Sequence, residues 1–357
     1  QTVPMLHRAL QAVSDVVATA GRAIDGERDL EEAAPGAGTP ARSGARGDGE
    51  GGSAPRRPAA PRRRRRLALN IVLQLAAMVA IALLVYPEAA DWFARLNHNA
   101  EISGYIERVD ATPSAERQAI LDAAYAYNEQ LQPGPLTDPY VSEAEDAALR
   151  SDLYLAYEEM LRVGGTDAIG TLSYPRLDIG LPIFHGTADE TISEGVGHLY
   201  GTSLPVGGPN THSVLTAHSG LPQAKLFTSL GEARVGDTFW ISVLGEDHHY
   251  RVESVETVLP GETESLRIID GEDWVTLFTC TPTGINSHRL MVHAARIPDG
   301  AAVDESEVIA GDGLAAGFPW WAVWFAGGSG AVAWVIFAPP RRRRRPSGSQ
   351  PAPEAAP

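Results

Sequence analysis

Two long apolar runs, each bordered on its outer side by a run of arginines, most constrain what this chain can fold into. Residues 67–86 contain no charged side chain and are about as long as the roughly 20 residues that a bilayer-spanning helix needs. Residues 318–338 form a second, weaker run with three glycines and four tryptophans. Five arginines precede the first run at 62–66, and five follow the second at 341–345. Because arginines favour the cytoplasmic side, the sequence predicts a cell-membrane protein with two spans, both termini in the cytoplasm and the middle outside.

The pattern divides the 357-residue chain into seven segments. They are a disordered cytoplasmic leader with a basic run (1–66), a transmembrane helix (67–86), a helical subdomain (87–165), a β-rich domain (166–298), a tether (299–317), a second transmembrane helix (318–338) and a basic cytoplasmic tail (339–357). Helical spacing of apolar residues supports helices at 115–131 and 151–162. From residue 169 onward, short β-rich runs alternate with Gly/Pro turns, which predicts an antiparallel barrel or sandwich.

Charge and cysteine content exclude several function classes. The net charge is −16 although two arginine runs are included, so the region between them is strongly acidic, and this argues against a nucleic-acid partner. Cys280 is the single cysteine, so the chain can form neither an internal disulfide nor a multi-cysteine zinc site. The ten histidines show no metal-ligand spacing. We therefore expect no metal and no organic cofactor.

Cys280 and Arg289 occupy the ends of two successive β-runs. Cys280 closes the run 274–279 and precedes a Thr-Pro-Thr-Gly loop, a position that exposes a nucleophile on a rigid element. Composition alone would favour a buried apolar cysteine. Arg289 begins the next run, so a hairpin would bring the two residues side by side, where the guanidinium favours the thiolate. The spacing alone leaves open a surface arginine that binds loop carbonyls.

His218 ends a third β-run, 212–217, and opens a Ser-Gly-Leu-Pro turn. Acyl transfer by a cysteine needs a base that forms the thiolate and an acid that protonates the leaving amine, and histidine suits both roles. With ten histidines in the chain, this position is a weak candidate on its own.

Several separated motifs together resemble the sortase family. Residues 276–280, Thr-Leu-Phe-Thr-Cys, resemble the TLxTC signature of sortases, and Ser-His-Arg-Leu follows at 287–290. Residues 197–218, with Gly-Thr-Ser-Leu-Pro-Val-Gly-Gly and Thr-His-Ser-Val-Leu-Thr-Ala-His, resemble class C, pilus-assembling sortases, as do 220–227. The resemblance implies a mainly β fold: a sortase-type β-barrel with an N-terminal helical subdomain, flanked by two transmembrane helices.

The resemblance also implies roles for particular residues. Cys280 would be the nucleophile, His218 the general acid/base and Arg289 the group that stabilises substrate or oxyanion. The tripeptide Asp138-Pro139-Tyr140 matches the lid of class C enzymes, although on local grounds alone it would be an ordinary Asp-Pro turn. Ser219 departs from the class, in which arginine often follows the histidine, and this bears on substrate preference.

The implied activity is transpeptidation on an LPXTG-like sorting signal through a thioester, with the acyl group passed to a lysine amine of another pilin. The implied partners are LPXTG-bearing pilin or surface proteins and the membrane. Three alternatives stay open at this point: a housekeeping sortase that anchors surface proteins to peptidoglycan, a cysteine protease, and a catalytically silent membrane adaptor.

Overall fold

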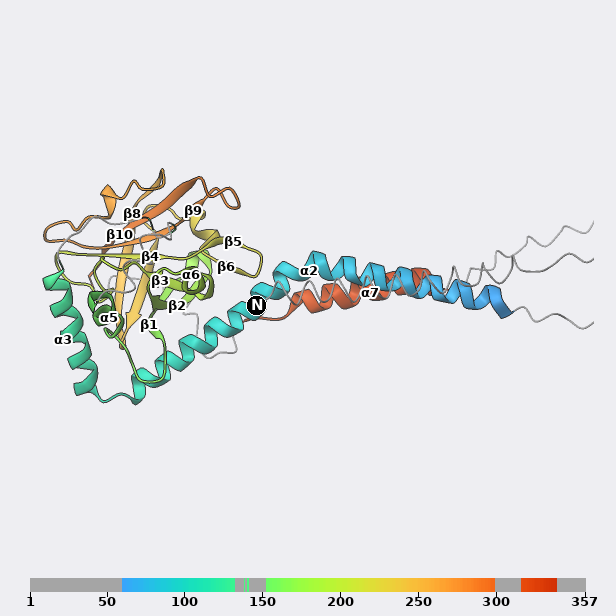
Figure 1. Ribbon diagram of the computed structural model, residues 1–357, viewed down its shortest axis with the longest axis horizontal. Helices are drawn as coiled ribbons and strands as arrows, with labels where there is room; N and C mark the ends of the chain where they lie inside the picture. The colour runs from blue at the N-terminus through green and yellow to red at the C-terminus, as the bar shows by residue number, and fades with distance from the viewer. Residues whose placement is uncertain (1–59, 132–137, 139, 141–151, 299–315, 339–357) are drawn as a thin grey trace, which may run out of the picture. The chain divides into compact units, whose positions relative to one another are not determined.

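The computed structural model describes residues 60–131, 138, 140, 152–298 and 316–338 (Figure 1). Two units can be distinguished, one made of residues 1–82 with 326–357 and the other of residues 83–325. The predicted leader, tether and cytoplasmic tail lie almost entirely outside the described residues.

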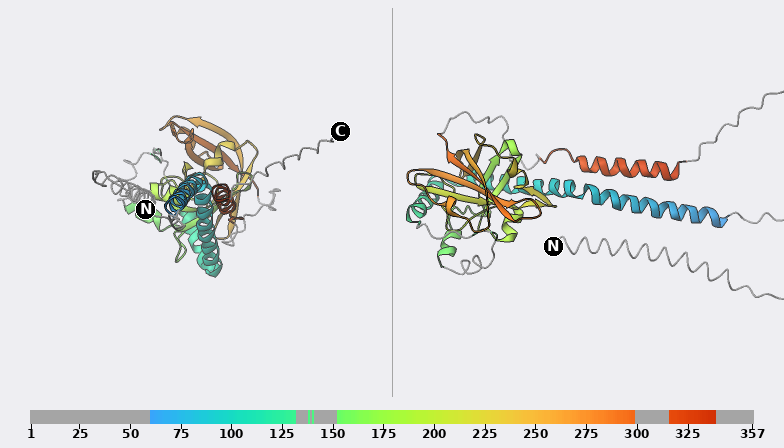
Figure 2. Two further views of the ribbon diagram at one scale, coloured as in Figure 1. Left: turned by 90° about the vertical axis from the view of Figure 1, so that its right-hand side faces the viewer. Right: turned by 90° about the horizontal axis from the view of Figure 1, so that it is seen from above.

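The first unit contains parts of two apolar helices, α2 (Ala60–Ala111) and α7 (Trp320–Phe337). Both are long and apolar enough to cross a membrane, with mean hydropathies of 2.5 and 1.4 in their most apolar windows. Inside this unit, the Asn70 amide donates to the Ile336 carbonyl at 3.2 Å and the Gln74 amide to the Ser329 carbonyl at 3.1 Å. The two helices lie side by side there (Figure 2).

Helix α2 does not end where the sequence analysis placed the end of the first span. It continues through Pro87 to Ala111, so the predicted boundary at 86/87 is not a break in secondary structure. A proline costs a helix one hydrogen bond, about 3 kcal/mol, but the residues after it favour the helix. Ile102, Tyr105 and Val109 are buried at helical spacing, and the Tyr105 hydroxyl donates to the Ile169 carbonyl and accepts from the Leu244 amide.

The second unit is built on a closed barrel of eight strands in the order β1-β2-β3-β4-β9-β10-β8-β7. The neighbours are antiparallel except for the parallel pairs β2/β3 and β4/β9. The barrel strands are β1 (Ala168–Tyr174), β2 (Ile179–His185), β3 (Val196–His198), β4 (Thr211–Thr216), β7 (Thr238–Val243), β8 (Glu246–Val258), β9 (Asp273–Thr281) and β10 (His288–Arg296). A small ribbon is formed by β5 (Ser219–Leu221) and β6 (Ala224–Leu226).

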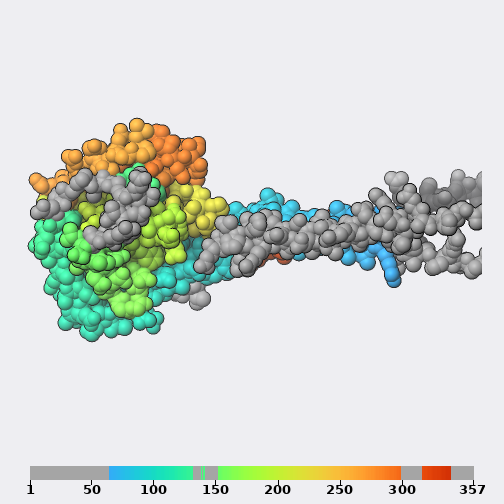
Figure 3. Space-filling view, viewed as in Figure 1, coloured from blue at the N-terminus to red at the C-terminus, as the bar shows by residue number. Residues whose placement is uncertain are grey.

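Helices accompany the barrel in the second unit. They are α3 (Ser114–Gln130), α5 (Asp152–Glu158), α6 (Asp189–Glu194) and the 3-10 turns η1 (Pro175–Leu177), η2 (Thr228–Glu232) and η3 (Glu264–Leu266). Helix α3 turns Leu121, Ala124 and Asn128 inward, and the Asn128 side chain exchanges two hydrogen bonds with the backbone of Leu204. In the space-filling view, the blue-green residues of α3 lie at the left and bottom of this unit, and the orange residues near the end of the barrel sequence lie along its top (Figure 3).

The expected barrel is confirmed, but the description "mainly β" is too narrow. The long α2, together with α3 and α7, makes the described structure a mixture of helix and strand. The parallel pairs also depart from the expected all-antiparallel sheet, because strands that pair across the barrel are separated in sequence by other elements.

Successive side chains of β9 point to opposite faces of the strand, and both faces are buried. Val275 and Leu277 point into the main core, whereas Phe278 and Cys280 lie on the opposite face. Phe278 belongs to a small second apolar cluster with Leu199, Val214, Leu266 and Met291, against which Tyr140 packs. The region where the predicted site residues meet lies against this second cluster.

Candidate active site

The hairpin of β9 and β10 brings Cys280 and Arg289 together, as the sequence predicts. The two residues are direct cross-strand partners in the antiparallel register. Each is 6% exposed. Cross-strand partners hold their side chains on the same face of a sheet, so the thiol and the guanidinium share one environment.

His218 reaches the same end of the sheet from β4. Strand β4 runs parallel to β9 with Thr216 opposite Phe278, so residues 218 and 280 lie two positions further along their respective chains. The backbone of His218 is fixed on both sides, because its amide donates to the Ile192 carbonyl at 3.2 Å and its carbonyl accepts from the Phe227 amide at 3.0 Å. The structure thus gathers the three residues that the sequence analysis selected.

Ser219 ties the histidine segment to the cysteine strand. Its hydroxyl donates to the Cys280 carbonyl at 3.1 Å and lies 3.3 Å from the Thr283 hydroxyl. The residue that departs from the family pattern therefore links two segments of the site. A longer arginine side chain would not make this short bond.

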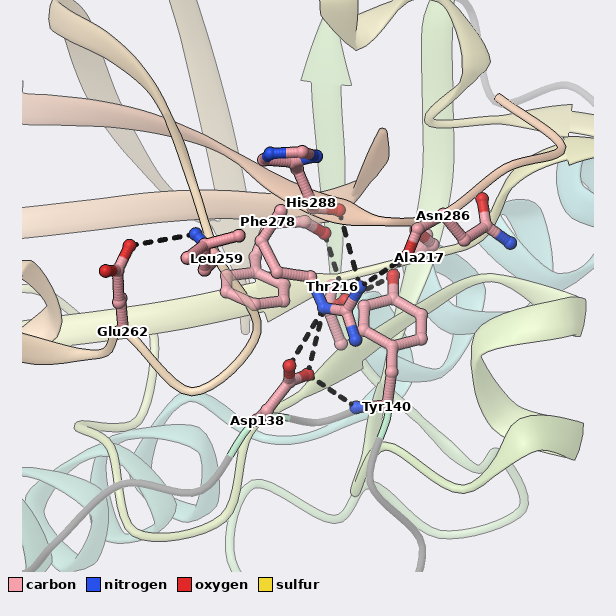
Figure 4. Close-up of polar contacts among 10 residues, drawn as sticks. Asp138, Tyr140, Thr216, Ala217, Leu259, Glu262, Phe278, Asn286 and His288 are labelled. Carbon is pink, nitrogen blue, oxygen red and sulfur yellow. Dashed lines mark hydrogen bonds and ion pairs between the residues drawn. The ribbon is translucent and has the colours of Figure 1, made fainter. Parts of the chain in front are cut away.

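Asp138 forms a buried ion pair with Arg289 (Figure 4). The Arg289 Nε donates to Oδ2 of Asp138 at 2.9 Å and to Oδ1 at 3.2 Å, and Asp138 is 4% exposed. The Nη1 of Arg289 donates to the carbonyls of Asn286 and His288 at 3.1 and 3.3 Å. Asp138 also accepts from the Tyr140 amide at 3.0 Å, which is the local bond of an Asx turn.

The Tyr140 ring lies near both His218 and Arg289. Its centroid is 5.8 Å from the His218 ring, 5.9 Å from the stacked Phe278 ring and 5.1 Å from Cζ of Arg289. Its hydroxyl donates to the Ala217 carbonyl at 2.8 Å, the carbonyl next to His218, and lies 2.9 Å from the Thr216 hydroxyl. Pro139, the third residue of the predicted lid, lies outside the described residues.

The electrostatics of this arrangement favour the neutral thiol. Burial raises the pKa of Cys280, and the nearby Asp138 carboxylate raises it further, while Arg289 and Tyr140 act in the opposite direction without cancelling the rise. Burial likewise raises the pKa of the Tyr140 phenol, which keeps it protonated as a donor. Because Asp138 neutralises Arg289, the arginine lowers the pKa of Cys280 less than its position in the sequence suggests.

Other buried histidines belong to the scaffold. Burial lowers the pKa of His198 and of His212 to about 4, so both rings are neutral near pH 7. His198 contacts the Tyr157 hydroxyl and the Ser203 carbonyl, and His212 contacts the Arg267 carbonyl and the Thr276 hydroxyl. Among the residues that the structure describes, no cluster of His, Cys, Asp and Glu could hold a metal ion.

One neighbour of the site was not predicted from the sequence. Asp189, in the first turn of α6, bonds to Nε2 of His218 at 2.9 Å. It lies 29 residues before the histidine, in a segment without motif character, and the packing of α6 against β3 and against the segment that follows β4 brings the two together.

Comparison with known proteins agrees with this architecture. The family model "Sortase domain" matches residues 172–297. Sortase C1 of Streptococcus agalactiae is 43% identical over 58% of this chain and 98% of that one, with a TM-score of 0.52. Sortase A from Corynebacterium diphtheriae is 39% identical over 58% of this chain and 95% of that one, with a TM-score of 0.51.

Two further sortases are similar to this chain. Streptococcus pneumoniae sortase C is 40% identical over 57% of this chain and 98% of that one, with a TM-score of 0.50. The curated sortase A of Streptococcus agalactiae serotype III (strain NEM316) is 29% identical over 129 residues, which are 35% of this chain and 51% of that protein. The chain thus matches about half the length of that curated relative.

The closed barrel, with a cysteine near the end of β9, together with these matches, defines the class of the protein as cysteine transpeptidases. Within that class, this chain belongs to the sortase family.

Proposed function

We propose that this sortase cleaves an LPXTG-like sorting signal and joins the acyl product to a lysine amine of another pilin. The observation that carries the pilus assignment is the buried pair of Asp138 and Arg289, with Tyr140 packed beside it, since these residues fit the predicted class C lid. Similarity to the Streptococcus pneumoniae sortase C, whose structure is described in terms of pilin substrate specificity, supports it further.

In the first half of the reaction, Cys280 attacks the threonine carbonyl carbon of the sorting signal after giving its proton to His218. Arg289 donates hydrogen bonds to the developing oxyanion. The peptide C–N bond breaks, and His218 returns the proton to the departing amine. The product is a thioester between Cys280 and the pilin.

In the second half, a lysine amine of another pilin attacks the thioester carbonyl and loses a proton to His218. The C–S bond breaks, an isopeptide bond forms and the thiol is regenerated. The two steps of acyl transfer need no external oxidant, reductant or cofactor.

The lid has to leave before either half begins. Asp138 occupies the Nε edge of Arg289, and the Tyr140 ring lies near both Arg289 and His218, so the lid residues hold the contacts that a substrate carbonyl would need. Covering the thioester again until a second pilin arrives favours attack by an amine over attack by water.

The two apolar helices support a membrane-anchored enzyme with the barrel outside and both termini in the cytoplasm. Arginine runs at 62–66 and 341–345 flank these helices on their outer ends. In this arrangement the barrel meets secreted substrates at the membrane surface.

The test uses the full chain with a purified pilin that carries an LPXTG-like signal and an acceptor lysine. We expect a covalent ladder of multimers that survives boiling in detergent. Replacing the acceptor lysine by arginine should stop the ladder and leave the thioester intermediate detectable. Monomeric pilin joined to a peptidoglycan precursor, without a ladder, would instead establish the housekeeping activity.

A further inference from the structure

The His218 ring is held by a carboxylate as well as by its own backbone. Oδ1 of Asp189 lies 2.9 Å from Nε2 of His218. The side chain of Asp189 is 84% exposed and that of His218 is 19% exposed, so the pair lies at the rim of the site. Helix α6 also provides the Ile192 carbonyl that accepts from the His218 amide. The same short element therefore fixes both the backbone and the ring of the histidine.

We infer that Asp189 is a positioning residue that fixes the tautomer of His218 and directs proton transfer through Nδ1. This inference rests on the proposed role of His218 as acid and base. An ionised carboxylate can only accept a hydrogen bond, so Nε2 must carry the proton of the pair. In the neutral ring Nδ1 is then the basic nitrogen, and in the protonated ring Nδ1 is the nitrogen that gives its proton away.

Apart from Asp189, the charged and titratable groups that the lid, β9 and β10 place around His218 do not supply an anion for its ring. Tyr140 faces the ring from the lid, and burial raises the pKa of its phenol, so it stays neutral. Arg289 lies beyond that ring on β10, and its charge is balanced by Asp138. Cys280 approaches from β9, and its pKa is raised by burial. Asp189 on α6 is thus the anion bonded to the imidazole.

The expected size of the effect is modest because the pair is exposed. Exposed ion pairs change equilibria by about 0.2–1 kcal/mol, which corresponds to a change of about 1.4- to fivefold in rate. We therefore expect Asp189→Asn and Asp189→Ala to lower kcat by about that factor and to leave KM unchanged, since Asp189 is not proposed to touch substrate.

Rescue by the conservative variant distinguishes positioning from a general loss of structure. Asp189→Glu keeps a carboxylate that can accept from Nε2 of His218, so it should restore most of the wild-type kcat, whereas Asp189→Asn and Asp189→Ala should not. The matched control is Glu190→Gln, which removes the neighbouring exposed carboxylate from the same first turn of α6.

The experiment measures kcat and KM for cleavage of an LPXTG-like peptide by the full chain, with the melting temperature of each variant. A wild-type enzyme without cleavage would overturn the proposed function, whereas the inference about Asp189 is judged only against an active wild type. Asp189→Asn and Asp189→Ala variants that match the wild type in kcat would overturn the inference, as would an equal effect of Glu190→Gln or a failure of Asp189→Glu to restore kcat. If Asp189→Asn lowers the melting temperature, Asp189→Ser replaces it, since serine removes the carboxylate and keeps a small polar side chain in the first turn of α6. The same loss of kcat is expected from that variant, and its absence counts against the inference.

Discussion

Arg289 uses different edges of its guanidinium for different partners. Its Nε binds the Asp138 carboxylate, while its Nη1 binds the two carbonyls of Asn286 and His288. The carbonyl contacts hold the side chain in place without Asp138, so the arginine remains oriented when the lid leaves. A lysine ammonium has no planar fork and cannot make both sets of contacts from one position.

We expect Arg289→Ala to lower kcat/KM for an LPXTG-like peptide by about 10²- to 10³-fold, the usual loss for one oxyanion donor. Arg289→Lys should recover only part of that loss. Steady-state kinetics on both variants, with melting temperatures as the control for folding, check the expectation. Near-normal turnover by Arg289→Ala would mean that this arginine is structural.

Asp138 is expected to control the ionisation of Cys280. Its carboxylate helps to raise the pKa of the thiol, and it neutralises the arginine that would lower that pKa. Asp138→Asn removes the negative charge that raises the pKa of Cys280, and it leaves the positive charge of Arg289 unbalanced. The pKa of Cys280 should therefore fall. The midpoint pH for alkylation of Cys280 by iodoacetamide should therefore move to lower pH.

Asp167→Asn is the matched control for this shift. Its side chain is 91% exposed and pairs with Arg162. It should leave the alkylation midpoint unchanged. An unshifted midpoint in Asp138→Asn would mean that the carboxylate does not act on the thiol.

Removing the contacts of Tyr140 in two steps should expose Cys280 in two steps. Tyr140→Phe removes the bonds to Ala217 and Thr216 but keeps the ring against Phe278, whereas Tyr140→Ala removes both. The rate of Cys280 labelling by a small thiol reagent should therefore rise from wild type to Tyr140→Phe to Tyr140→Ala. Fold stability should change little, because lids belong to the weakly held parts of a structure.

Tyr125→Phe serves as the control, since that hydroxyl lies 3.5 Å from the Glu246 side chain and is not among the site contacts. Equal labelling rates in wild type and both Tyr140 variants would return Asp138-Pro139-Tyr140 to the status of an ordinary turn.

The elements differ in how far the sequence could predict them. The β9/β10 hairpin was predictable because alternation and loop length are local signals, and they set Cys280 opposite Arg289. The continuation of α2 past Pro87 was not, because the signal for a break is local while the burial of Tyr105 depends on the barrel. Asp189 was missed for the same reason: an exposed acidic residue acquires its partner only when α6 packs against β3 and the segment that follows β4.

For the whole molecule, the arginine runs predict which parts of the chain are accessible from outside. Protease applied to intact cells should remove the barrel at residues 166–298 and spare tags placed at both ends of the chain. Immunoblots against the two tags, with and without permeabilisation, measure this. Loss of the C-terminal tag from intact cells would contradict the proposed topology.

The intact mass of the full chain after incubation with an LPXTG-like peptide tests the central proposal most directly. Because Cys280 is the single thiol, a thioester can form at one position only. The account predicts one adduct with the mass of the acyl fragment, its loss on addition of an amine with formation of the joined product, and no adduct in Cys280→Ala. An adduct of equal amount in Cys280→Ala, or peptide cleavage by that variant, would contradict it.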